Sequence, residues 1–244
     1  MGDPLKIING VFGIIYFVAW SIGFYYQIAL IYRLKSGEGF SLDNQLLSNI
    51  GMIYYCVYNT YYMITVRADF ESILDVVYSV QAVFLGLWIL AASLYFPHGI
   101  NKFNFSVGVV LAIVLMMALT YYVLGVRALG VPVSDLWFFL GITESWVCVV
   151  KYLYQIFLNY DKKSTVGYAI EGVWGDILGA VCSLLQFVIN KVIDQQEINW
   201  AKVLLAIISV VFDIILLYQH YLVYKNRQPS IAVKHMNEKL VDES

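Results

Sequence analysis

Long apolar runs separated by short polar segments make up almost the whole chain. Each run reaches about 20 residues, the length that an α-helix needs to cross a hydrocarbon core of about 30 Å. The pattern predicts seven membrane-spanning helices, at 9–32, 44–66, 73–95, 105–126, 134–160, 170–190 and 200–224. The first run is too long for a signal-peptide core and lacks a small-residue cleavage site, so we expect it to be retained. The chain is therefore expected to be an all-α membrane protein.

A short polar motif occurs twice at a constant offset of 128 residues. The first copy runs from Tyr26-Gln27 through Lys35-Ser36 to Gly39-Phe40, and the second from Tyr154-Gln155 through Lys163-Ser164 to Gly167-Tyr168. A second pair of patterns, Asp75 with Gln81 and Asp213 with Gln219, lies at an offset of 138 residues. This larger offset predicts ten extra loop residues in the second copy. Self-similarity at a fixed period indicates an internal structural repeat.

Two three-helix units that run in the same direction need an odd number of crossings between them. The predicted arrangement is therefore 3+1+3, with 105–126 as the connector helix between two parallel repeats. Parallel repeats related by an axis along the membrane normal are one way in which solute transporters are built. The expected units are an N-terminus (1–8), repeat 1 (9–96), connector (97–133), repeat 2 (134–227) and a tail (228–244).

Composition agrees with a membrane location and excludes several other classes. Hydrophobic residues make up 61% and charged residues 13% of the chain, against roughly 45–50% and about 25% in soluble domains. Basic residues are few and scattered, so no nucleic-acid partner is expected. No nucleotide loop, nucleophile elbow or metal-ligand spacing is present, so we expect neither an enzyme nor a metal site. Lysine and arginine near the spans number nine on the side of the C-terminus and five on the other side, which predicts a cytosolic C-terminus and a lumenal N-terminus.

Among the ionisable residues in or beside the predicted spans, where each charge is costly, five are candidates for a functional role. They are Asp75, Glu144, Lys151, Asp176 and Asp213. One interpretation is that buried ion pairs only hold the helices together. The other is a transport site, since an ammonium group and a carboxylate together suit a zwitterionic solute. Burial also favours the neutral form of an aspartate, so such a group can take up a proton on one side of the membrane and release it on the other.

Spacing along the helices bears on Glu144 and on one further residue, His220. Glu144 precedes Lys151 by seven residues, or about 10 Å along a helix, so we expect no direct contact between them. His220 follows Asp213 by seven residues on the same helical face. It is either a proton relay toward the cytosol or a residue that anchors the helix end at the membrane interface.

Three blocks of sequence resemble the cystinosin family of PQ-loop proteins, which export cystine from lysosomes together with protons. The blocks are 17–22, 151–186 and 211–220. The resemblance implies seven helices in the architecture of the SWEET sugar transporters. It also implies that Asp176 binds the coupling proton, that Lys151, Trp20 and Phe24 line the substrate cavity, and that Asp75 and Asp213 are needed for transport.

The chain departs from the family pattern at four positions. Tyr26 and Tyr154 replace the prolines that precede Gln27 and Gln155 in the family, which removes two expected hinge points. Ser48 and Gly172 stand where cystinosin-like chains carry asparagine in the cavity. Loss of hydrogen-bonding groups from a buried site changes its discrimination between substrates.

These observations predict a proton-coupled transporter that exports cystine or a related amino acid from an acidic lumen to the cytosol by alternating access. We expect a multi-pass protein of the lysosomal, vacuolar or endosomal membrane, with a small-molecule substrate, membrane lipid as its surroundings and no cofactor other than protons. A cationic amino-acid transporter of the same superfamily, suggested by Glu144, remains an alternative. A SWEET-like sugar carrier and a non-transporting seven-helix receptor or trafficking protein are the others.

Overall fold

Six long α-helices account for most of the residues that the structure describes. The computed structural model describes residues 4–65, 70–104, 132–194 and 200–225, and isolated positions between 108 and 130. The helices are α1 (Pro4–Leu34), α2 (Leu42–Thr65), α3 (Phe70–Tyr95), α5 (Val133–Lys162), α6 (Ile170–Asp194) and α7 (Trp200–Tyr218), and the π-helical turn η2 (Gln219–Val223) continues α7. They match six of the predicted spans to within five residues at each end. The predicted connector helix at 105–126 lies almost wholly outside the described residues.

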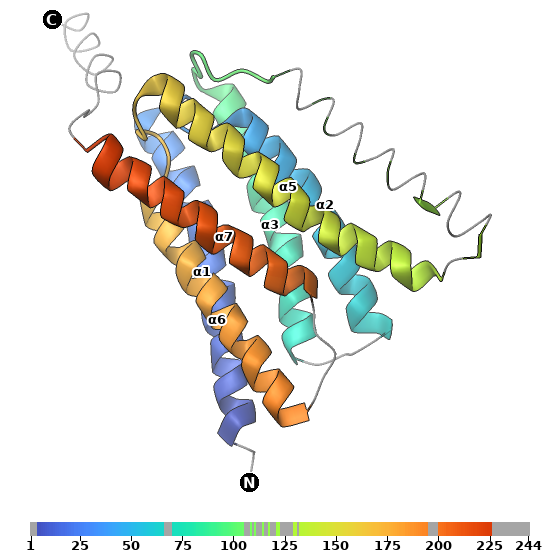
Figure 1. The fold of residues 1–244 in the computed structure, drawn as a ribbon. Coiled ribbons are helices and arrows are strands. Elements are labelled where there is room, and N and C mark those ends of the chain that lie inside the picture. Colours follow the sequence, from blue (N-terminus) through green and yellow to red (C-terminus); the bar gives the residue numbers. More distant parts are fainter. Residues whose placement is uncertain are drawn as a thin grey trace, which may run out of the picture.

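The six helices form a closed ring made of two similar halves (Figure 1). Helix α3 packs between α1 and α2, and α7 packs in the same way between α5 and α6. The halves meet where α1 packs against α6 and where α2 packs against α5. In Figure 1, α1, α3, α5 and α7 run in one direction, while α2 and α6 run back. The two triplets are therefore parallel repeats related by a pseudo-two-fold axis.

The offset between corresponding helices changes little along the two repeats. Helix α2 ends at Thr65 and α6 at Asp194, while α3 begins at Phe70 and α7 at Trp200. The links between these helices are nearly equal in length, so the predicted ten extra loop residues are wrong. Asp75 lies near the beginning of α3 and Asp213 well inside α7, so these aspartates are not equivalent. A single aspartate followed by a glutamine in an apolar helix is too short a pattern to fix a register.

The outer surface of the bundle is apolar, unlike that of a soluble protein. Four of the described helical segments, 4–34, 72–95, 170–191 and 201–223, are long and apolar enough to cross a membrane by length and composition. Large apolar side chains such as Val18, Phe84 and Leu178 are exposed on the outside. Buried polar residues gather inside on α2, where the Gln45 amide donates to Asn49 Oδ1 and to the Gly86 carbonyl. This distribution is that of a multi-pass membrane protein, in which lipid replaces water as the surroundings.

Candidate functional site

A cavity lies between the two repeats, lined from both sides. The cavity offers about 110 Å³ of space to the centre of a water molecule. One bound water needs roughly 10–15 Å³ of such space. There is therefore room for several waters or for part of a small solute. Its lining residues are Trp20, Gly23, Phe24, Gln27, Phe40, Asn44, Gln45, Ser48, Met52, Tyr78, Ile89, Lys151, Tyr152, Tyr168, Ala169, Gly172, Val173, Asp176, Leu205 and Ser209.

The structure brings all six predicted substrate-binding residues to this one cavity. They are Trp20, Phe24, Ser48, Lys151, Gly172 and Asp176. The Trp20 indole donates a hydrogen bond to the backbone carbonyl of Asp176 over 3.1 Å. Gly172 lets the backbones of α1 and α6 approach closely, because a Cβ at this position would lie 2.9 Å from the Cα of Gly23. The small residues thus set how close the two repeats come beside the cavity.

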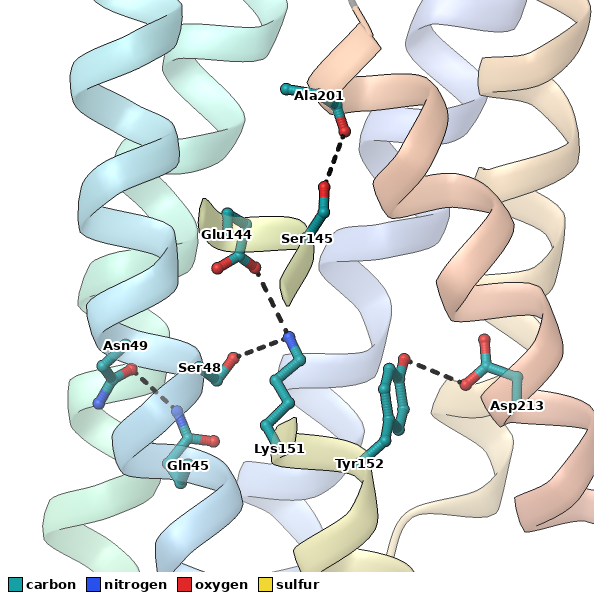
Figure 2. A network of polar contacts seen from close by, with 9 residues as sticks. All are labelled: Gln45, Ser48, Asn49, Glu144, Ser145, Lys151, Tyr152, Ala201 and Asp213. Carbon is teal, nitrogen blue, oxygen red and sulfur yellow. Dashed lines mark hydrogen bonds and ion pairs between the residues drawn. The ribbon is translucent and has the colours of Figure 1, made fainter. Parts of the chain in front are cut away.

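The Lys151 ammonium sits between two groups that do not come from the same helix (Figure 2). Its Nζ donates to Ser48 Oγ on α2 at 3.3 Å and lies 3.8 Å from Oε1 of Glu144 on α5. The expectation that Glu144 and Lys151 make no direct contact is therefore wrong. Side chains on a helix lean toward its N-terminus, so the long lysine side chain reaches back along α5 and covers most of the rise between the two residues.

Asp176 lines the cavity, but its carboxylate does not form an ion pair with the Lys151 ammonium group. Within the described part of the chain, the carboxylate within 4 Å of Lys151 is that of Glu144, not that of Asp176. Oδ1 of Asp176 is directed toward α1, since a Cβ at Gly23 would lie 3.7 Å from it. By the 128-residue offset, Ser48 corresponds to Asp176 and Gly23 to Lys151. The second repeat thus supplies both charges of the cavity.

Asp213 lies one layer behind the cavity wall. It is fully buried and accepts a hydrogen bond from the Tyr152 hydroxyl at 3.2 Å, while its other oxygen has no hydrogen-bond partner among the described residues. The Tyr152 ring lines the cavity and stacks on Phe212 at 5.2 Å. Asp213 is therefore connected to the cavity lining by its hydrogen bond with Tyr152 (Figure 2). Sequence reasoning did not single out Tyr152, although it directly follows Lys151.

Asp75 belongs to a different polar network, away from the cavity lining. Its Oδ1 lies 3.0 Å from Nζ of Lys202 and also accepts a hydrogen bond from the Tyr16 hydroxyl. The Lys202 ammonium lies 4.0 Å from the centre of the Tyr16 ring and donates to Gln186 Oε1 at 3.4 Å. This network joins α1, α3, α6 and α7. Lys202 is one of the five basic residues predicted near the span ends on the side opposite the C-terminus, whereas its side chain is buried.

The glutamines of the repeated motif hold the two repeats together reciprocally. Gln27 donates to the Gly167 carbonyl at 3.0 Å and accepts from the backbone N–H of Ala169 at 2.9 Å. Gln155 makes the equivalent contacts, donating to Gly39 at 3.0 Å and accepting from Ser41 at 2.8 Å. Each glutamine therefore binds the loop of the opposite repeat. We call these four hydrogen bonds the glutamine latch.

Two stacked rings lie beside the glutamine latch. Phe40 and Tyr168, which are equivalent by the 128-residue offset, stack at a centroid distance of 5.7 Å and an interplanar angle of 10°. Both rings line the cavity. The backbones of Gly39 and Gly167 come so close here that a Cβ on either would overlap the other. The cavity is therefore narrowed at this end by residues that match in the two repeats.

The remaining predicted residues lie outside the cavity lining. Tyr26 is 44% exposed and Tyr154 is half-buried. α1 and α5 continue without a break through these positions, where the family has proline. Nδ1 of His220 lies 2.7 Å from the Thr165 hydroxyl in the loop between α5 and α6. That contact ties η2 to the loop, and the relay role of His220 stays a prediction.

Comparison with known proteins agrees with this architecture. The model of the PQ loop repeat family matches residues 8–62 and 136–196, which cover α1 with α2 and α5 with α6. Each half of this multi-pass membrane protein is thus similar to one PQ loop repeat. Its sequence is 29% identical to a cystinosin homolog of Arabidopsis thaliana, in an alignment that covers 99% of this chain and 96% of that protein. The resemblance to the cystinosins is confirmed.

Two other relatives differ in length from each other. The cystinosin of Drosophila melanogaster is 28% identical over 90% of the chain, but the chain spans only 59% of that protein. A protein of Saccharomyces cerevisiae named cystine transporter is 24% identical, and the alignment covers 93% of this chain and 98% of that protein. The similarity therefore extends over the whole bundle in relatives of both lengths.

Proposed function

We propose that this protein is a proton-coupled transporter that carries cystine, or a closely related amino acid, from an acidic organelle lumen to the cytosol. The observation that carries the proposal is the cavity between the repeats, where Lys151 and Asp176 present opposite charges that do not pair with each other. The relatives named cystinosin and cystine transporter support this substrate class. The resemblance to the cystinosin family, whose members export cystine from lysosomes, supports a lysosomal, vacuolar or endosomal membrane as the location.

The lining of the cavity suits the two ends of an amino acid. Lys151 binds the substrate carboxylate, because an ammonium group and a carboxylate form a charge-assisted hydrogen bond. Asp176 binds the amino group in its ionised form and carries the coupling proton in its neutral form. Trp20 and Phe24 provide apolar and aromatic surface for the rest of the solute, as is usual in ligand sites. Asp213 and Asp75 contribute to proton coupling from outside the cavity lining.

The proposed topology has seven helices in a 3+1+3 arrangement. Helix α3 ends at one end of the bundle and α5 begins at the other (Figure 1). In the proposed topology the apolar run at 105–126 crosses the membrane once between these two helices. The lysine and arginine bias assigns the N-terminus to the lumen and the C-terminus to the cytosol.

The proposed transport cycle is alternating access, which the similarity of the two halves supports. The glutamine latch lies at the end of the bundle that this topology assigns to the cytosol, and it keeps that end closed in the described conformation. Transport requires the two repeats to rock about the cavity, so that the latch opens while the lumenal end closes. Substrate and proton leave to the cytosol at this step.

The test is uptake of labelled cystine by cells that carry the protein on their surface, at acidic and neutral external pH. We expect uptake that is faster at acidic pH and lost in Asp176→Asn. Asp161→Asn is the matched control, because Asp161 is exposed at the end of α5 and lies outside the cavity lining. Full acid-stimulated uptake by Asp176→Asn at normal expression rules out the role of Asp176. Absence of uptake by the folded wild-type protein rules out cystine as the substrate.

A further inference from the structure

Glu144 is a fully buried carboxylate that the proposed transport cycle does not use. Its exposed fraction is 0%, and neither oxygen accepts a hydrogen bond from a described residue. The cation beside it is Lys151, 3.8 Å away. Gly51 on α2 provides the space for this carboxylate, since a Cβ at Gly51 would overlap Oε2. A buried carboxylate depends on its cation, because an unpaired buried charge is strongly unfavourable.

The position of Glu144 means that it acts on a solute through Lys151. Lys151 and Ser48 line the cavity, whereas Glu144 does not. Figure 2 shows the Lys151 side chain extending toward Glu144, with Ser48 beside its ammonium group. The carboxylate is therefore covered on the cavity side by the lysine that it neutralises.

The charges around the cavity determine which charged groups of a solute it binds. Lys151 is the cation of the cavity lining, and Glu144 already balances it from behind. A carboxylate of the solute must compete with Glu144 for the same ammonium group. Asp176 faces the cavity directly and attracts a cationic group of the solute. Carboxylate groups of a solute are therefore bound more weakly than its ammonium groups.

We propose that Glu144 is a positioning residue that makes the cavity select amino acids of zero or positive net charge over those of negative net charge. This inference rests on the proposed function, since it assumes that the cavity binds amino acids. It explains how a site with a lysine as its anion-binding group discriminates against acidic amino acids, which carry an excess carboxylate.

The experiment measures binding of cystine, lysine and glutamate to the purified full chain by ligand-induced thermal stabilisation. We expect Glu144→Gln to raise the affinity for glutamate relative to lysine by roughly tenfold or more, because Lys151 then has no competing carboxylate. Glu144→Asp keeps the charge and is expected to keep the wild-type ratio. A purely structural role of Glu144 would affect both ligands alike in either variant. An unchanged ratio in Glu144→Gln overturns the inference.

A double variant tests the route through Lys151 and does not depend on the folding of Glu144→Gln. Removing both charges in Glu144→Gln/Lys151→Gln leaves no uncompensated ion, which favours folding. We therefore compare this double variant with the wild-type protein. Its affinity for glutamate relative to lysine is expected not to exceed the wild-type value, and an increase of about tenfold would show that Glu144 acts directly on the solute. A wild-type protein that binds none of the three amino acids refutes the proposed function as well, whereas binding with an unmoved ratio refutes this inference alone.

Discussion

Removal of one side of the glutamine latch is expected to open one end of the bundle. Gln27 and Gln155 each make two hydrogen bonds to the backbone of the opposite repeat, at 2.8–3.0 Å. A leucine at either position leaves one carbonyl and one N–H group unpaired in the closed state, and each such group costs about 1–3 kcal/mol. Because water pairs these groups in the open state, the closed state loses about 2 kcal/mol or more. That corresponds to a population shift of roughly thirtyfold.

The shift can be measured as a distance between the two motif loops. Spin labels at Glu38 and Val166, in a background without native cysteines, report the separation of loops that Lys162 now joins through its contacts with both backbone carbonyls. We expect a single short distance in the wild-type background. Gln27→Leu and Gln155→Leu should each add a population at longer distance, and by similar amounts, because their contacts with the opposite repeat are equivalent.

The control uses the same substitution away from the latch. Gln81 on α3 donates to the Tyr25 hydroxyl at 3.3 Å within the first repeat, so Gln81→Leu is expected to leave the loop distance unchanged. Unaltered distances in both latch variants would refute the reasoning. A change in only one of them would show that the two glutamines contribute unequally to the stability of the closed state.

Three further outcomes follow from contacts elsewhere in the bundle. Lys202→Met leaves the Asp75 carboxylate buried without its cation and is expected to destabilise the fold by about 3–5 kcal/mol. The melting temperature should largely recover when Asp75→Asn is added. Additive losses of stability in the double variant would contradict the pairing. Gly51→Ala should lower the melting temperature because its Cβ would overlap a buried carboxylate, while Gly10→Ala, which meets nothing within 4 Å, should not. Tyr152→Phe removes the hydrogen bond to the aspartate behind it and should destabilise the protein by about 1–3 kcal/mol. Slower substrate uptake is expected from this last variant, and wild-type rates at equal expression would exclude a coupling role for the hydroxyl.

The helices and their pairing were largely predictable from the chain. A helix that crosses a membrane needs a long apolar run, so the ends of six runs agree with six described helices to within five residues. The repeated motif was informative because its residues contact one another across the pseudo-two-fold axis, as Phe40 and Tyr168 do. A pattern kept in both repeats therefore marked the place where the repeats meet.

The contacts of the buried charges were not predictable in the same way. Spacing along α5 separated Glu144 from Lys151, but the direction of the lysine side chain brought them within 3.8 Å. Counting basic residues placed Lys202 at the end of a span and could not show that it pairs with Asp75 across two helices. The prediction that Asp75 and Asp213 are equivalent was wrong, because an aspartate and a glutamine six residues apart are too few matching positions to align two apolar helices. Side-chain direction and contacts between distant helices depend on the assembled fold.

The bundle combines a symmetric closure with an asymmetric site. The residues that close one end, Gln27 and Gln155 among them, are the same in both repeats, as expected if two equivalent halves move against each other. The charges of the cavity come only from the second repeat, because Gly23 and Ser48 occupy the positions that correspond to Lys151 and Asp176. Cystine carries an ammonium and a carboxylate group at each of its two α-carbons, so the charged pair Lys151 and Asp176 can bind one of these two ends at a time. The latch keeps the symmetry that a rocking motion of two halves needs, whereas the charged pair of the cavity comes from one repeat and gives the bound solute a single orientation.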